Sequence, residues 1–215
     1  SDAIESFTRW RELSVEENEN VYLGLANSHY NLAQYNEAIP LLIDHMELAQ
    51  ANGKTLAKNI YGLLNLMYIE LEDYTNAERI TKQMATLFDE PSDWRNLSAI
   101  YGYLDDDKKR IETLSVTFSK GFMENESEFL NLAQSLAGAD APYQGAKVLE
   151  AGLQQGAVEE DEDNMNRLVQ MYLLASEYEM ALAPAIKAAE LAENGDSYDQ
   201  LGYIYYMLHD YENAA

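Results

Sequence analysis

The sequence predicts an all-α protein built from a repeated pair of antiparallel helices. One pattern of large, apolar and small residues starts at positions 22, 61, 94, 129, 165 and 198, so successive copies are 39, 33, 35, 36 and 33 residues apart. Within each copy the spacing follows one helical face. The 215 residues include only 4 prolines and 11 glycines, which leaves room for long helices. They include no cysteine, which excludes disulfides and thiolate metal sites.

The first copy shows the pattern most fully. Its first helix carries one stripe at spacing i, i+3, i+4, i+7 and i+10, made of Tyr22, Leu25, Ala26, His29 and Leu32. Tyr35 and Ala38 then open a second helix. A small residue at Ala26 or Ala38 lets the partner helix approach closely, so the stretch is predicted to fold as a helical hairpin.

The later copies follow in register. Those that start at Tyr61, Met165 and Tyr198 repeat both helices and place Ala77, Ala181 and Ala214 in the second. Those that start at Trp94 and Phe129 keep the first helix, but Asp107 and Arg110, or Pro142 and Gly145, replace the Tyr and Ala of the second. Because Asp105–Asp107 makes the hairpin that starts at Trp94 less apolar, we expect this third copy to be the weakest joint.

Departures from the pattern predict local changes. The longer first step places its additional residues near 50–54, so the second helix or its connection should be extended there. Pro91 and Pro142 are expected at helix starts, where a missing N–H costs little. Pro40 and Pro184 lie further inside second helices and are expected to loosen or kink the first turn.

We expect one continuous array over residues 1–215, because a single hairpin cannot cover its own apolar faces. The array would comprise a half repeat at 1–17, repeats that start near 19, 58, 91, 126 and 162, and a truncated repeat at 195–215. Since the chain starts without Met, we interpret it as a piece of a longer protein.

These motifs resemble the tetratricopeptide repeat (TPR) family over essentially the whole chain. The resemblance implies a right-handed superhelix, an α-solenoid of antiparallel helix pairs. It also implies a scaffold or adaptor role in protein–protein association, with a peptide or a helix held in the concave groove. One TPR subtype clamps a C-terminal carboxylate with Lys and Asn. Asn27 and Asn96 stand at matching positions, but Leu23 and Ser92 replace the lysines, so this clamp is not expected.

A narrower resemblance involves residues 152–164 and 188–195, which are similar to bacterial TPR proteins encoded beside TonB energy-transduction systems. It implies a periplasmic adaptor for TonB-dependent transport at the outer membrane. Two alternatives remain open. One is a general assembly or regulatory adaptor, periplasmic or cytoplasmic. The other is the substrate-recruiting region of an enzyme whose catalytic domain lies outside this chain.

First helices line the inner face of such an array, so the stripe not used for packing supplies candidate ligand contacts. In the register of the first copy, the candidates are Leu23, Asn27, Tyr30, Asn31, Leu66, Arg95, Gln134, Asn166, Gln170, Tyr203 and Tyr206. Amides can donate to and accept from an extended peptide backbone, and Tyr adds contact area with a polar tip. The simpler interpretation is that these are ordinary exposed helix residues.

The charge balance limits the partners. There are 38 acidic residues against 14 basic ones, a net charge of −24, which disfavours nucleic acid and anionic lipid. A protein or peptide partner with a basic segment fits better, as does a merely solvated acidic surface. The run Glu159–Asp163 lacks the glycine and the alternating acids of a calcium loop, and acids at a helix start also stabilise the helix dipole. No apolar stretch approaches the ~20 residues of a membrane span, so no direct membrane insertion is expected.

Catalytic and metal sites are not expected. His29 and His45 could face each other across the first hairpin, but both occupy packing positions, so we interpret them as structural. No arrangement of a nucleophile with a base and no glycine-rich phosphate loop is evident. The sequence therefore predicts no cofactor, no metal and no enzymatic activity within the chain.

Overall fold

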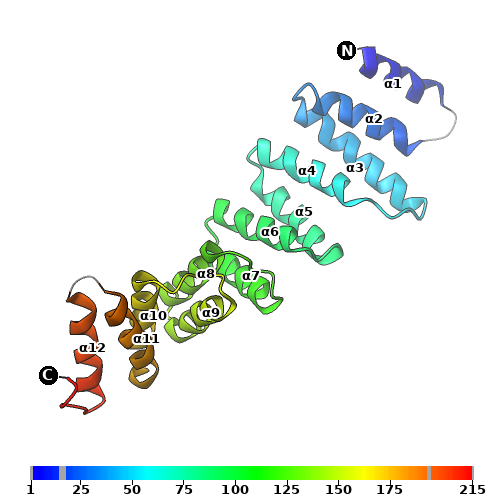
Figure 1. Ribbon diagram of the computed structural model, residues 1–215. Coiled ribbons are helices and arrows are strands. Elements are labelled where there is room, and N and C mark those ends of the chain that lie inside the picture. The colour runs from blue at the N-terminus through cyan, green and yellow to red at the C-terminus, as the bar shows by residue number, and fades with distance from the viewer. Residues whose placement is uncertain (1, 15–17, 193–194, 215) are drawn as a thin grey trace. The chain divides into compact units, whose positions relative to one another are not determined.

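The computed structural model describes residues 2–14, 18–192 and 195–214, and within these residues every regular element is an α-helix (Figure 1). The helices are α1 Asp2–Leu13, α2 Glu19–Tyr30, α3 Tyr35–Ala51, α4 Lys58–Glu70, α5 Tyr74–Leu87, α6 Pro91–Tyr103, α7 Asp107–Ser119, α8 Glu126–Gly138, α9 Pro142–Gln155, α10 Glu162–Leu174, α11 Tyr178–Leu191 and α12 Asp196–Met207. The predicted all-α class is confirmed. No helix of the described residues is both long enough and apolar enough to cross a membrane.

The chain divides into two compact units, unit 1 with residues 1–110 and unit 2 with residues 111–215. The division falls inside α7, the second helix of the copy expected to form the weakest joint. The buried residues of α7 are two threonines, Thr113 and Thr117. The single continuous array stays a prediction. Of its terminal parts, residues 1, 15–17 and 215 lie outside the described residues.

Unit 1 stacks helical hairpins around an aliphatic core. The first helix α2 packs against the second helix α3, α4 packs against α5, and α5 also contacts α6. The central side chains are at most 2% exposed and include Leu42, Leu64, Met67, Ile80 and Ile100. The small residues Ala26, Ala38 and Ala77 are fully buried, as the close helix approach predicted from the sequence requires.

Unit 2 repeats the arrangement with α8 against α9 and α10 against α11, followed by α12. Its core includes Phe129, Leu132, Leu149, Tyr172 and Ile204, each at most 1% exposed. Gly145 of α9 lies so near α8 that a Cβ added to it would stand 2.5 Å from the carbonyl oxygen of Ala133. The small residues at these positions therefore set how closely the two backbones approach.

The helix ends agree with the sequence. Pro91 and Pro142 are the first residues of α6 and α9. The second helix α3 has 17 residues against 14 in α5, so the extension expected near residues 50–54 lies at its end. Pro40 and Pro184 lie inside α3 and α11, and each helix continues beyond its proline. The bends expected there stay predictions.

The turns between first and second helices share one backbone conformation. A residue with positive φ, between 52° and 59°, lies two positions before each of the second helices α3, α5, α7, α9 and α11: Ala33, Glu72, Asp105, Asp140 and Ser176. His209, with φ 61°, takes the same place after α12, where residues 211–214 form turns. The sequence separations of these residues, 39, 33, 35, 36 and 33, equal the intervals between the copies. The period therefore appears in the backbone as well as in the residue pattern.

Candidate peptide-binding surface

In unit 1 an ion pair with a buried aspartate joins the neighbouring first helices α4 and α6. Lys58 opens α4, and its Nζ lies 2.7 and 2.8 Å from the two carboxylate oxygens of Asp93 on α6. Asp93 is 1% exposed, and it also accepts from the backbone N–H of Glu90 at 3.3 Å. Burial opposes the charge of Lys58, but hydrogen bonds to Asp93 and Glu90 outweigh it and raise the pKa of the lysine.

In unit 2 two hydrogen bonds join the first helices α8, α10 and α12 in the same way. Asn164 of α10 donates to Oε1 of Glu126 on α8 at 2.7 Å. Ser197 of α12 donates to Oε1 of Glu162 on α10 at 2.8 Å. Asn164 and Ser197 are each 3% exposed, so both links lie at packed positions.

All three links occupy one register. Each joins the residue three positions before the opening large residue of one copy to the residue directly before the opening residue of the next. The sequence contained this signal, because Asp93, Asn164 and Ser197 are polar residues that directly precede Trp94, Met165 and Tyr198. The repeat pattern is defined by apolar and small residues, so this polar position does not enter it.

Most of the predicted peptide-binding residues are exposed, either on their first helices or, for Asn31, directly after the end of α2. The exposed ones are Asn27, Asn31, Leu66, Gln134, Gln170, Tyr203 and Tyr206. Tyr203 and Tyr206 also line an open cavity of about 530 Å³ together with Tyr198 and Asn213. These side chains are therefore accessible to a partner, which is the first requirement of a binding surface.

Four of the predicted peptide-binding residues are half-buried and already contact other residues of the chain. Leu23 and Tyr30 are half-buried and pack against the core of unit 1. Arg95 is half-buried and already engaged in an interaction. Asn166 is half-buried, and its Nδ2 donates to Oγ of Ser197 at 3.1 Å. Their role in binding stays a prediction.

Within unit 2 three exposed candidates align. Gln134, Gln170 and Tyr203 each stand five residues after the opening large residue of their copy, on α8, α10 and α12. Since these three helices are linked side by side at their first turns, equivalent positions lie along one face. The face presents two amides followed by an aromatic ring.

The histidines have structural partners. His45 is buried, and its Nδ1 lies 2.9 Å from the carbonyl oxygen of Glu19. His29 is half-buried, with its Nδ1 2.9 Å from Oε1 of Gln34. His45 therefore occupies a packed position, whereas the packing role of His29 stays a prediction. In the described part of the chain no three His, Cys, Asp or Glu side chains are grouped closely enough to hold a metal ion.

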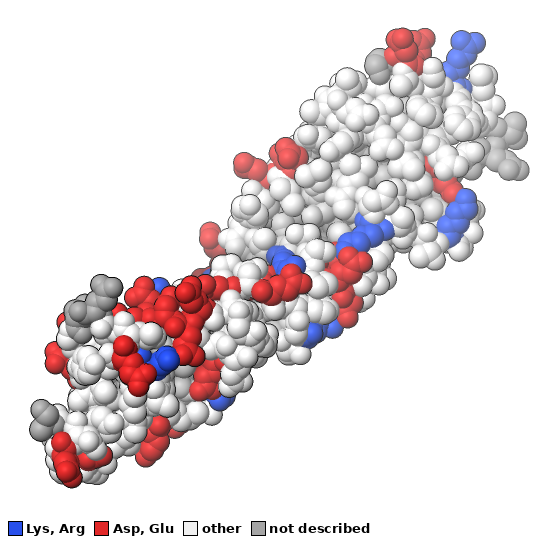
Figure 2. Space-filling model, in the orientation of Figure 1, with Lys and Arg blue, Asp and Glu red and all other residues white. Residues whose placement is uncertain are grey.

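The acidic run Glu159–Asp163 is also tied into the fold. Asp161 caps α10 and accepts from the backbone N–H of Asn164 at 2.8 Å. Glu160 pairs with Lys187 at 3.0 Å, and Glu162 accepts from Ser197. Figure 2 shows that acidic side chains outnumber basic ones on the visible face. The local arrangement fits a helix start better than an ion site.

The repeated hairpins and their linked first helices define the TPR fold. The chain is similar in structure to YrrB, described as a TPR protein with an unusual peptide-binding site, with a TM-score of 0.50 and 16% identity over 98% of this chain and 100% of that one. It also matches MamA, with a TM-score of 0.49 and 12% identity over 84% of this chain and 95% of that one. A third match is the C-terminal part of a TPR repeat-containing protein from Cytophaga hutchinsonii, with a TM-score of 0.46 and 17% identity over 86% of this chain and 70% of that one.

Neither a family model nor a curated protein matches the chain. At 16% identity the likeness to YrrB establishes the fold alone.

Proposed function

We propose that this chain is a protein–protein interaction scaffold whose first helices bind an extended segment of a partner protein. The observation that carries the proposal is the alignment of exposed Gln134, Gln170 and Tyr203 on three linked helices. Two amides can donate to and accept from a peptide backbone, and the tyrosine can cover a side chain. The peptide-binding site described for YrrB, which shares this fold, adds support.

The experiment is a selection of peptides from a random displayed library against the full chain, followed by affinity measurement with variants. The double variant Gln134→Ala, Gln170→Ala should weaken selected peptides about tenfold, because each lost side-chain hydrogen bond contributes about 0.5–1.5 kcal/mol. The matched control is Gln144→Ala, Gln155→Ala, which removes two exposed amides from the second helix α9. Equal affinities for the two double variants would remove the first-helix surface from the proposal.

The finer form of the proposal is a periplasmic adaptor of a TonB-dependent transport system. Its support is the sequence resemblance of residues 152–164 and 188–195, of which 193–194 lie outside the described residues. The net charge of −24 adds a reason to expect a basic partner segment. The binding constant for such a segment should then fall as salt rises. A pull-down from cells that recovers other partners and no TonB-system component would reject this form while leaving the scaffold proposal in place.

Two alternative functions would use the same first-helix surface: a general assembly or regulatory adaptor, and the recruiting region of an enzyme. The two alternative functions predict different partners in a pull-down, but the same binding residues. The sequence outside this chain, read for a signal peptide and for a catalytic domain, distinguishes them.

A further inference from the structure

An open groove runs between the second helices α3 and α5 of unit 1. Its volume is about 510 Å³. Ile43, Met46, Glu47 and Gln50 form the α3 wall, Arg79, Ile80, Lys82, Gln83, Thr86 and Leu87 form the α5 wall, and Tyr61 and Leu64 of α4 form the floor. None of the predicted peptide-binding residues lines this groove.

The groove follows from the repeat and from the extension of α3. Tyr61 and Leu64 belong to the packing stripe of α4 and are only 5% and 1% exposed, so they form a closed floor between the two second helices. Gln50 lies in the additional turn of α3, so the extension lengthens that wall. The equivalent groove of unit 2, floored by Met165 and Leu168 between α9 and α11, has a volume of about 330 Å³.

The lining is suited to a helix. On α5, Ile80, Gln83 and Leu87 are spaced i, i+3 and i+7, and on α3 Ile43, Met46 and Gln50 have the same spacing. Such walls run parallel to the helix axes and accept the apolar stripe of an amphipathic helix. Leu87 is 59% exposed, so it offers apolar surface that a partner would cover.

The α5 wall carries basic side chains, whereas the chain as a whole is strongly acidic. Arg79 is exposed and forms no hydrogen bond or ion pair with any described residue. In the unit 2 groove the position equivalent to Arg79 is Ala183, and the cation that lines that groove, Lys187, is already paired with Glu160 at 3.0 Å. A chain of net charge −24 repels acidic partners over most of its surface, so a free arginine beside apolar side chains marks where an acidic group can dock.

We propose that the α3–α5 groove binds an amphipathic helix of a partner protein, with an apolar stripe against Leu87 and Ile43 and an acidic residue facing Arg79. A second copy of this chain is the poorer occupant, because two chains of net charge −24 repel each other. This site is separate from the first-helix surface, so a partner can use either one alone.

The test uses two designed libraries of helical peptides with the same leucine stripe, one with glutamates on one flank and the other with lysines there. Because the chain has no cysteine, Gln83→Cys can be labelled with an environment-sensitive dye to report entry into the groove, and Thr75→Cys on the same helix reports outside it. The glutamate library should yield binders that shift the dye at position 83 and not at position 75.

Two substitutions then test the contacts. Arg79→Glu should weaken the selected acidic peptides at least about fivefold and improve the matched lysine peptides, since an opposed charge pair becomes a like pair. Leu87→Asn should weaken both. The matched control Lys187→Glu changes the net charge equally and should leave the affinity unchanged. Circular dichroism checks that each variant is folded.

The proposal is overturned if neither library yields a binder that shifts the dye at position 83, or if both are enriched equally. It is also overturned if Arg79→Glu and Lys187→Glu act alike. Loss of binding in Gln134→Ala, Gln170→Ala tests the first-helix surface, so failure of one site is distinguishable from failure of the other.

Discussion

Single polar residues link the first helices of each unit. Asp93 holds Lys58 across the α4–α6 contact, and Asn164 and Ser197 take the equivalent positions in unit 2. The first link is an ion pair, the second a hydrogen bond from an amide and the third a hydrogen bond from a hydroxyl. All three join the same two positions of successive repeats. In each link the residue on the later helix is buried and its partner is half-buried, so removal of the buried member costs the partner one hydrogen-bonding group.

Asp93→Ala should lower the free energy of unfolding by about 1–3 kcal/mol, because it leaves the Lys58 ammonium without its buried partner. The remaining ammonium is 29% exposed and keeps Glu90, which limits the loss. Urea unfolding of Asp93→Ala beside Asn96→Ala, an exposed position on the same helix, measures it. Equal stability of the two variants would contradict the role given to the ion pair.

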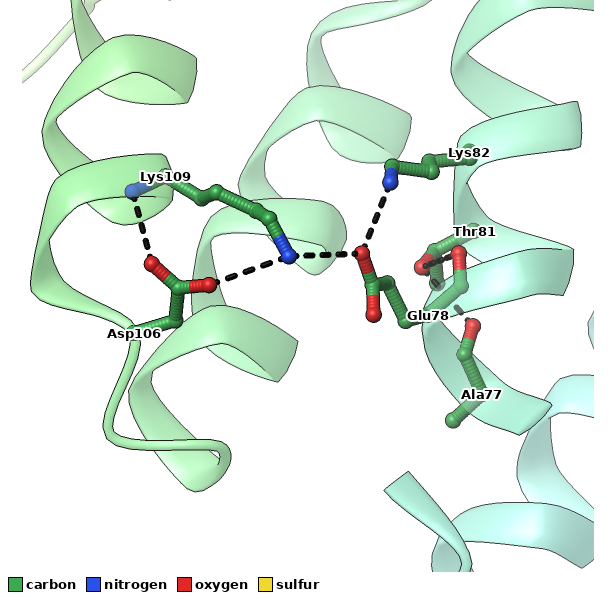
Figure 3. Close-up of polar contacts among 6 residues, drawn as sticks. All are labelled: Ala77, Glu78, Thr81, Lys82, Asp106 and Lys109. Atoms are coloured by element: carbon green, nitrogen blue, oxygen red, sulfur yellow. Dashed lines mark hydrogen bonds and ion pairs between the residues drawn. The ribbon is translucent and has the colours of Figure 1, made fainter. Parts of the chain in front are cut away.

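A second ionic cluster ties α5 to the start of α7 within unit 1. Glu78 accepts from Lys82 at 2.7 Å and pairs with Lys109 at 3.5 Å, and Lys109 also reaches Asp106 at 3.0 Å (Figure 3). Both lysines lie over the ring of Tyr101, at 5.8 and 5.3 Å from its centroid. The hydrogen bond from Lys82, against the cost of burial, lowers the pKa of Glu78 below its usual value of 4.5.

Glu78→Gln should lower stability at about pH 7 by about 0.5–1.5 kcal/mol, and the difference from the native chain should shrink in acid. A lowered carboxylate pKa contributes stability above the unfolded value of 4.5 and loses it as pH falls through the folded value. Urea unfolding from neutral to acidic pH gives both curves. A difference that stays constant with pH would show that Glu78 acts through packing alone.

At the scale of the element, hairpin packing decides conformations that the local sequence does not favour. The positive-φ turn position is occupied by Ala33, Glu72, Ser176 and other non-glycine residues. Outside glycine, asparagine and aspartate this backbone region is unfavourable, so the turn residues themselves give little signal. The turn is imposed because both helices it joins are held in the stack.

Gly145→Ala should destabilise the α8–α9 hairpin by about 1–3 kcal/mol, because the added methyl group would meet the Ala133 carbonyl oxygen at 2.5 Å. The control is Gly138→Ala in the same hairpin, where a Cβ meets nothing within 4 Å. That substitution should be neutral or stabilise by up to about 1 kcal/mol, since alanine favours the helix. Thermal unfolding ranks the two variants, and the reverse order would refute the close approach of α8 and α9.

At the scale of the whole molecule, net charge acts on solubility and on stability together. With 38 acidic and 14 basic residues, the folded chain concentrates like charges that the unfolded chain spreads apart. Ion pairs such as those of Lys58 and Lys109 relieve this repulsion locally, but 14 basic residues cannot neutralise 38 acidic ones.

Added salt should therefore raise the thermal midpoint. We expect a gain of about 1 kcal/mol between about 10 and 150 mM sodium chloride, which corresponds to about 2–4 °C for a chain of this size. Differential scanning calorimetry over that range measures the change, and sodium sulfate at matched ionic strength separates screening from preferential exclusion. A midpoint that falls with salt would mean that the ion pairs outweigh the repulsion.

By itself the sequence determined the period, the helical class and the closest helix contacts. These follow from the spacing of apolar residues and from small residues such as Ala38, Ala77 and Gly145, because side-chain size and periodicity act locally along one helix face. The helix starts at Pro91 and Pro142 were equally predictable, since proline fixes its own backbone.

Tertiary structure alone decided which of the remaining side chains are free. Leu23 and Tyr30 belong to the predicted binding stripe, yet they pack partly against the core, whereas Gln134 and Gln170 stay exposed. A helical register assigns a direction to a side chain but not the distance to the next helix. That distance depends on how neighbouring hairpins stack, and the same stacking left the α3–α5 groove with its free Arg79.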